Sequence, residues 1–357
     1  MSNEKFEIEQ VAPALRAIGS NDAAREKFLV LCKAIEKDIT DYPGSVRDDI
    51  TGPLVDALHD ESQVVRKVLA DGAVFDFLYR TKIARDFVLS SPVNPDHVWE
   101  PQTTRLLVHF ASRCQDVLVG GAYFGDQAVL MARAMRDSGG HCHAFEPNKA
   151  QLEMLRHNAR LNGLQNIHAW ELGLWSDSSE QLRLVGNDSF AHAEPAGSDS
   201  EDSFATITVD EYCTRQNIKR LGLIMLDIEG AESRVLEGAV EQLARPAGEA
   251  PDIVFEVHRH YVDWSAGLEN APISRLLAGH GYRLFAVRDF NSNVDMSGRP
   301  IELIAVDKVY LEGPPHGFNM LAIKDPRTLE GLDVAYCEGV SPKLLWHRDP
   351  ALHHPLN

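Results

Sequence analysis

Residues 116–135, DVLVGGAYFGDQAVLMARAM, decide the fold of this 357-residue chain. A short apolar run leads into a glycine-rich turn, and the residues after the turn predict a helix over 124–137. Glycines at such a turn let a ligand approach the backbone, and the helix offers free amides at its N-terminus. The glycines stand at 120, 121 and 125, so the turn is neither the dinucleotide fingerprint GxGxxG nor a P-loop.

The same alternation of apolar runs and amphipathic stretches continues along the chain. Further strands are predicted at 141–147, 167–174, 221–230 and 252–258, and closing strands at 282–289, 301–307 and 318–324. Further helices are predicted at 149–162, 231–244 and 273–282. Strands that alternate with helices indicate an α/β fold, in which helices cover both faces of a parallel sheet.

Three regions do not follow this alternation. Residues 1–100 read as a helical cap or dimerisation region, with shorter helical patches over 48–89 and a proline-rich linker at 90–102. Residues 176–203 are rich in small and acidic residues, which predicts an inserted loop or hairpin. The chain therefore divides into a helical region (1–100), a ligand-binding domain (101–325) and an irregular tail (326–357).

Composition and charge exclude several classes of partner. The chain has 53 acidic and 35 basic residues, a net charge of −18, which disfavours nucleic acid and anionic membranes. No apolar run approaches the roughly 20 residues of a membrane helix, and the N-terminus lacks a signal peptide's apolar core. The five cysteines form no CxxC pair, so free thiols and a cytoplasmic location are expected.

Glu146 follows the second predicted strand, where an acidic residue can accept hydrogen bonds from both hydroxyls of a ribose. Asn148 then caps the next helix, with Gln151 as its capping-box partner. The alternative is that Glu146 serves only the helix N-terminus. Ribose binding is favoured because the glycine turn lies where the rest of a nucleotide cofactor would sit.

Carboxylates gather after the next two strands. Asp227, Glu229 and Glu232 directly follow one apolar strand. Placing three negative charges so close to a buried strand is unfavourable, so a functional role for them is favoured. Glu256 and His258 alternate at the end of the following strand, so they share a face. Ligands of open α/β sheets bind outside this edge, which makes these residues a candidate site.

These motifs resemble the FkbM-type family of S-adenosylmethionine-dependent methyltransferases. The resemblance covers roughly residues 114–310 and rests on GGAYFGD, AFEPN, ITVDEY, LDIEGAE and VFEVH. It implies a class I (Rossmann-like) methyltransferase fold, with a mostly parallel sheet of seven strands after the N-terminal helices. The family usually has an acidic residue where this chain has Val119, and an asparagine at Tyr123. That acid helps to hold the amino-acid end of the cofactor, and Tyr123 is an alternative contact for the sulfonium.

The resemblance also implies a cofactor site and a catalytic group. The expected cofactor contacts are Gly120, Gly121, Ala122, Tyr123, Gly125, Glu146, Asn148, Gly173 and Asp227. Methyl transfer to a hydroxyl needs a base or a metal, and His258 has the pKa suited to a base. Asp227 and Glu256 would orient the acceptor. The alternative is that Asp227, Glu256 and His258 bind a divalent cation such as Mg²⁺ or Mn²⁺.

The expected activity is therefore O-methylation of a hydroxyl on a small molecule, sugar or secondary metabolite, with S-adenosylmethionine as methyl donor. Two alternatives stay open. One is methylation of a nitrogen or carboxylate. The other is a non-catalytic protein that binds a partner through its N-terminal helices, and a homodimer built by those helices is a further expectation.

Overall fold

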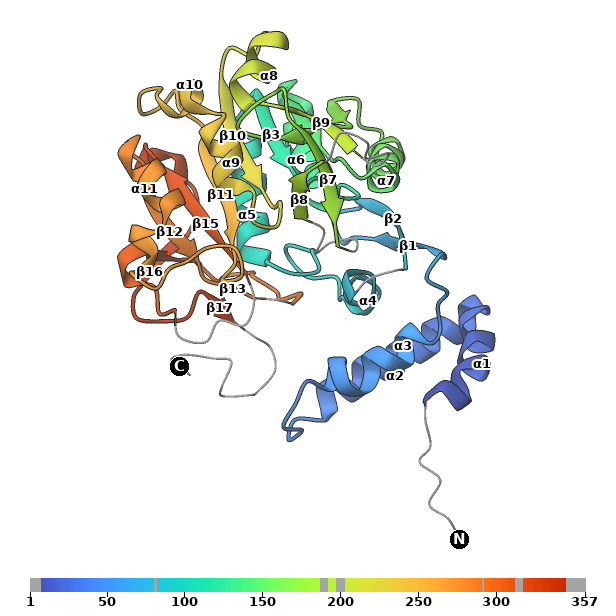
Figure 1. Ribbon diagram of the computed structural model, residues 1–357. Helices are drawn as coiled ribbons and strands as arrows, with labels where there is room; N and C mark the ends of the chain where they lie inside the picture. The colour runs from blue at the N-terminus through green and yellow to red at the C-terminus, as the bar shows by residue number, and fades with distance from the viewer. Residues whose placement is uncertain are drawn as a thin grey trace.

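A nine-stranded sheet, in the order β16-β14-β12-β15-β11-β10-β3-β4-β5, forms the centre of the protein (Figure 1). The computed structural model describes residues 8–79, 82–186, 192–196, 203–290, 292–311 and 317–344. The strands of the sheet are β3 (Asp116–Gly120), β4 (His141–Phe145), β5 (Ile167–Trp170), β10 (Leu221–Leu226), β11 (Asp252–Val257), β12 (Arg283–Val287), β14 (Ile301–Ala305), β15 (Phe318–Ile323) and β16 (Val334–Cys337).

Strands β5, β4, β3, β10 and β11 are parallel neighbours, and the chain order reverses between β3 and β10. Such a reversal opens a crevice at the carboxyl ends of the two central strands, where ligands of α/β sheets bind. The predicted α/β sheet is confirmed, but it has nine strands instead of seven. One addition, β16, comes from the segment predicted to be an irregular tail, where it pairs with β14.

Period-two alternation in the strands builds a separate core on each face of the sheet. In β3, Val117 and Val119 belong to one core and Leu118 to the other. The first core is covered by α5 (Pro101–Ala111), α6 (Asp126–Met135) and α7 (Lys149–Leu161). The second is covered by α8 (Val209–Arg215), α9 (Glu232–Glu237), α10 (Val240–Leu243) and α11 (Pro272–Gly279). Both faces are therefore buried, as a largely parallel sheet requires.

The N-terminal region is not all helical, which corrects the prediction for residues 48–89. Helices α1 (Ile8–Gly19), α2 (Asp22–Asp38), α3 (Gly52–Asp56) and α4 (Lys82–Leu89) flank a hairpin of β1 (Val64–Val68) and β2 (Val74–Leu78). Figure 1 shows the hairpin beside α7. There the Asn158 side chain accepts a hydrogen bond from the Asp76 N–H (2.8 Å) and donates one to the Asp76 carbonyl (3.0 Å).

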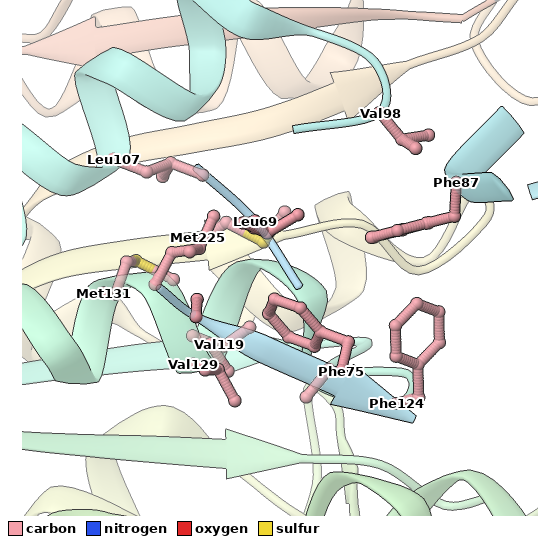
Figure 2. Packing of buried hydrophobic residues seen from close by; sticks show 14 of the residues in the cluster. Leu69, Phe75, Phe87, Val98, Leu107, Val119, Phe124, Val129, Met131 and Met225 are labelled. Atoms are coloured by element: carbon pink, nitrogen blue, oxygen red, sulfur yellow. The ribbon is translucent and has the colours of Figure 1, made fainter. Parts of the chain in front are cut away.

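Aromatic packing joins this hairpin to the core of the ligand-binding domain. Phe75 lies 6.0 Å from Phe87 and 6.3 Å from Phe124, measured between ring centroids. Figure 2 shows these three rings in the same hydrophobic cluster as Val119 and Met225 of the central strands. The division of the chain at residue 100 stays a prediction, but the segment before it shares one hydrophobic core with the sheet.

Two smaller sheets complete the architecture. A four-stranded sheet joins β6 (Gly173–Leu174), β9 (Ser203–Ile207), β7 (Gln181–Val185) and β8 (His192–Pro195). Because β7 and β8 pair antiparallel, the predicted inserted hairpin is confirmed. A parallel pair of β13 (Asp289–Phe290) and β17 (Lys343–Leu344) brings the C-terminal segment back to the sheet. Within the described residues, no helix has both the length and the apolar character needed to cross a membrane.

Candidate active site

One cavity of about 590 Å³ opens at the carboxyl ends of the central strands. Four of the five motifs named in the sequence analysis contribute lining residues, namely GGAYFGD, AFEPN, LDIEGAE and VFEVH, whereas ITVDEY does not. The predicted site residues that line it are Gly120, Gly121, Ala122, Tyr123, Glu146, Asn148, Gly173, Asp227, Glu256 and His258. Gly125 is the exception. It precedes the first residue of α6 with a φ of 94°, so it serves the turn and does not line the cavity.

The glycine turn packs tightly against the loop after β10. Gly121 has a φ of 74°, and a Cβ built on it would lie 1.8 Å from the Asp227 carbonyl oxygen. Only glycine fits both restraints. The N–H groups of Gly121 and Ala122 donate to the Phe145 carbonyl (3.1 and 3.0 Å), which ties the turn to β4. The glycine turn is thus fixed between the end of β4 and the loop after β10.

Glu146 is buried at the end of β4 and organises the backbone around it. Its Oε2 accepts the Tyr123 N–H (2.8 Å) and its Oε1 accepts the Asn148 N–H (2.7 Å). An ionised carboxylate has about four acceptor positions, so both oxygens can accept further bonds from a ligand in the cavity. Asn148 caps α7 as predicted, because its Oδ1 accepts the N–H groups of Ala150 and Gln151.

Three carboxylates converge on the other side of the cavity. Oxygens of Asp227, Glu229 and Glu256 all lie within 4.8 Å of one another. Burial and the charge of Glu256 raise the pKa of Asp227 well above its usual value. Burial and the charge of Glu229 raise the pKa of Glu256 to about 8. The three groups therefore resist being ionised together unless a proton or a cation is present.

Glu232, the remaining acid of the LDIEGAE motif, has a structural role. Its Oε1 accepts the N–H groups of Ile228 (3.0 Å) and Gly230 (3.3 Å). These bonds fix the loop on which Asp227 and Glu229 stand. Burial raises the pKa of Glu232 to about 7, although the two backbone donors act in the opposite direction.

His258 also lines the cavity, and the predicted group of Asp227, Glu256 and His258 stays a prediction. Its Nδ1 accepts the His260 N–H (3.1 Å), and its ring stacks on His260 with centroids 4.6 Å apart. Burial and the charge of His260 lower the pKa of His258. Glu229 is the third member of the carboxylate cluster, and the sequence did not single it out from its neighbours. The Tyr261 hydroxyl forms a hydrogen bond with Glu229.

Two further cavity residues had not been predicted. Glu100 and Lys343 form a buried ion pair, with Oε1 and Nζ 2.8 Å apart. Asn319 donates to the other Glu100 oxygen at 2.7 Å. Burial alone would lower the pKa of Lys343, but Glu100 outweighs it and the pKa is raised. The two residues are 243 positions apart, and neither stands in a recognisable motif.

One comparison with known proteins finds a family that the central part of the chain resembles. Residues 120–284 match the family model described as the methyltransferase FkbM domain, which confirms the resemblance read from the motifs. This match includes every predicted site residue, whereas Glu100 and Lys343 lie outside it. No curated protein matches the chain.

Solved structures of methyltransferases are similar only at a distance. An O-methyltransferase from Bacillus cereus has a TM-score of 0.32 and 15% identity, over 62% of this chain and 80% of that one. Methyltransferase FkbM from Methylobacillus flagellatus has a TM-score of 0.34 and 12% identity, over 58% of this chain and 43% of that one. The O-methyltransferase TomG from Streptomyces achromogenes has a TM-score of 0.34 and 10% identity, over 68% and 86%. Similarities this distant carry no argument about function.

Proposed function

Because residues 120–284 match the family model of the methyltransferase FkbM domain, we propose that the chain transfers a methyl group from S-adenosylmethionine to the hydroxyl of a small molecule. The observation that carries the proposal is one shared cavity, which has Glu146 and the glycine turn on one side and three carboxylates on the other. The first side suits a ribose and the second suits a polar acceptor. The methyl group would pass between them.

The residues present fit the cofactor. Glu146 offers acceptors for the ribose hydroxyls, and Asn148 and Gly173 border the cavity beyond it, where the base would lie. Tyr123 stands in the left-handed region with a φ of 47° and packs on Phe124, so its ring is fixed at the cavity wall. S-adenosylmethionine supplies an electrophilic methyl group, and the protein supplies its alignment with the acceptor.

The carboxylates would prepare the acceptor. An alcohol is a weak nucleophile, and a positioned group that takes its proton accelerates the reaction. Asp227 and Glu256 stand at the ends of adjacent strands. Burial raises the pKa of both carboxyls, that of Glu256 to about 8, which makes them stronger bases than exposed carboxylates. His258 stays at the cavity wall as a second proton carrier.

The same three carboxylates fit a divalent cation. An all-oxygen donor set of this size suits Mg²⁺ or Mn²⁺. A bound cation would lower the pKa of an acceptor hydroxyl next to it. Asp227, Glu229 and Glu256 would hold it, in place of the predicted set with His258.

Manganese binding distinguishes the two ligand sets. If the cluster holds a cation, the metal-free protein should bind one Mn²⁺, measured by electron paramagnetic resonance of the free ion. Glu229→Gln should weaken this binding by at least about tenfold, because it removes one carboxylate ligand. His258→Ala is the matched control and should leave it unchanged. The reverse pattern would restore the ligand set with His258, and absence of binding would leave proton sharing as the way the cluster is neutralised.

Cofactor binding separates the proposed enzyme from its rival, a non-catalytic protein with this fold. Calorimetric titration with S-adenosylhomocysteine should show one site per chain, with the micromolar affinity common for enzyme ligands, on the order of 10⁻⁶ M. A flat titration with folded protein would refute the methyltransferase proposal.

A cavity with this excess of carboxylates does not suit an anionic acceptor, so nucleic acid and carboxylate acceptors are disfavoured.

A further inference from the structure

We propose that Asp126 and Gln127, in the first turn of α6, bind the α-amino group of S-adenosylmethionine, and that His97 positions Asp126. This inference rests on the proposed function. Neither Asp126 nor Gln127 is among the cofactor contacts expected from the sequence. The inference also explains how a chain with Val119 in place of the family's acidic residue can hold the amino-acid end of its cofactor.

Position 119 cannot serve that end of the cofactor. The Val119 side chain is 1% exposed and belongs to the core between the sheet and α6. Figure 2 shows it beside Val129 and Met225. Valine offers no hydrogen-bond acceptor, so acceptors for an ammonium group must come from elsewhere on the cavity wall.

Among the acids that line the cavity, Asp126 is the nearest to Val119 along the chain, and a buried histidine contacts its carboxylate. The residue lines the cavity, and its Oδ2 lies 3.3 Å from Nε2 of the fully buried His97. The other ring nitrogen of His97 lies 2.8 Å from the Trp99 carbonyl oxygen. Both partners are acceptors, so His97 must carry two protons to bond both. Burial alone would lower the pKa of His97, but Asp126, the Trp99 carbonyl and Glu100 act together in the opposite direction and the pKa is raised.

The side chain of Gln127 gives a second line of evidence for a ligand here, separate from Asp126. The residue is 8% exposed and lines the same cavity. Among the described residues, its buried Oε1 has no hydrogen-bond partner. A buried carbonyl oxygen without a donor is unfavourable, so a donor is expected to reach it from the cavity. An ammonium group has three N–H donors and could bond Asp126 and Gln127 at once.

The order of residues along the cavity fits this assignment. Glu146 stands at the end of β4, and the glycine turn follows the neighbouring strand β3. A cofactor with its ribose at Glu146 would cross the turn, and its amino-acid end would then lie at the start of α6. The carboxylates after β10 and β11 stay free to face the acceptor.

Two ligands that differ only at the amino-acid end test the proposal by calorimetry. S-adenosylhomocysteine carries the amino group, whereas 5′-methylthioadenosine keeps the adenosine and sulfur without it. Asp126→Asn should weaken binding of S-adenosylhomocysteine by about 10- to 100-fold, the range for a hydrogen bond to a charged group. Gln127→Met should weaken it by roughly 5-fold, because a neutral bond is lost. Both variants should bind 5′-methylthioadenosine within about twofold of the wild type.

The positioning role of His97 has its own test. His97→Gln should weaken S-adenosylhomocysteine binding in the wild type but add nothing in the Asp126→Asn background, because it acts through Asp126. Asp137→Asn, the same change at an exposed site beyond the end of α6, is the control and should alter neither ligand. Equal losses for both ligands, or no loss in Asp126→Asn and Gln127→Met, would overturn the assignment. A wild type that binds neither ligand would refute the proposed function itself.

Discussion

Replacing Asp227 by asparagine should lower the rate of methyl transfer by about 10²- to 10⁴-fold, the range for losing a positioned proton-transfer group. An amide keeps the size of the side chain but cannot take up the acceptor's proton, and it is a weaker ligand for a cation. The same change removes one of three carboxylates that lie within 4.8 Å of one another. In metal-free protein it should therefore raise the midpoint of thermal unfolding, because like charges in this half-buried cluster repel.

The two effects of Asp227→Asn are measured separately. Release of S-adenosylhomocysteine, with an acceptor that the wild type methylates, reports the rate, and calorimetry in the presence of chelator reports stability. Asp137→Asn is the control for the chemical change, since its side chain is 95% exposed. Activity within threefold of the wild type would remove Asp227 from the chemistry. A lower unfolding midpoint would mean that the carboxylate stabilises the loop after β10 and is not a source of repulsion.

The sheet could be predicted because its signals are local. LGLIMLDIEG and DIVFEVH are apolar runs that end in acids, and they form β10 and β11 as adjacent parallel strands. The hairpin β1–β2 was missed although it also carries a local signal. Its strands alternate, with Phe75 and Phe77 buried, and the turn between them contains Asp71-Gly72, with Gly72 at a φ of 83°. Such a dipeptide between alternating stretches favours a hairpin over a helix.

The site was predictable only where its residues follow strand ends. Asp227, Glu146 and Glu256 stand directly after or within strands, so the parallel sheet brings them to one edge. Glu229, the third member of the carboxylate cluster, lies in a loop and not in a strand. Glu229 has a φ of 52°, in the left-handed region, and the N–H groups of its neighbours Ile228 and Gly230 donate to Glu232. Period-two alternation does not describe a residue in such a conformation.

Contacts between residues far apart in the chain could not be predicted from local sequence patterns. Glu100 was placed in a proline-rich linker and Lys343 in an irregular tail, yet they form a buried ion pair in the cavity. No spacing rule links positions this far apart. The pairing of β13 with β17 sets their contact, and strands of two residues are too short to carry a recognisable pattern.

Replacing Glu146 by alanine should weaken the binding of S-adenosylhomocysteine by about 2–3 kcal/mol, or roughly 30- to 150-fold, the scale for lost hydrogen bonds to a charged acceptor. The loss alone is ambiguous, because Glu146 also accepts the N–H groups of Tyr123 and Asn148. A loosened turn would weaken any ligand. Glu153→Ala, on the exposed side of the following helix, controls for a change to α7 and should bind normally.

A thermodynamic cycle with 2′-deoxy-S-adenosylhomocysteine separates the two roles of Glu146. If its carboxylate binds the ribose, the wild type should bind the deoxy ligand about tenfold more weakly than the parent, since one charge-assisted bond is missing. In Glu146→Ala the two ligands should bind alike, because the partner of the hydroxyl is already gone. Equal discrimination by both proteins would show that Glu146 only organises the backbone, which is the alternative that its two N–H partners support. The coupling energy between Glu146→Ala and loss of the 2′-hydroxyl, measured by calorimetry, thus decides whether Glu146 contacts the ribose or only stabilises the glycine turn.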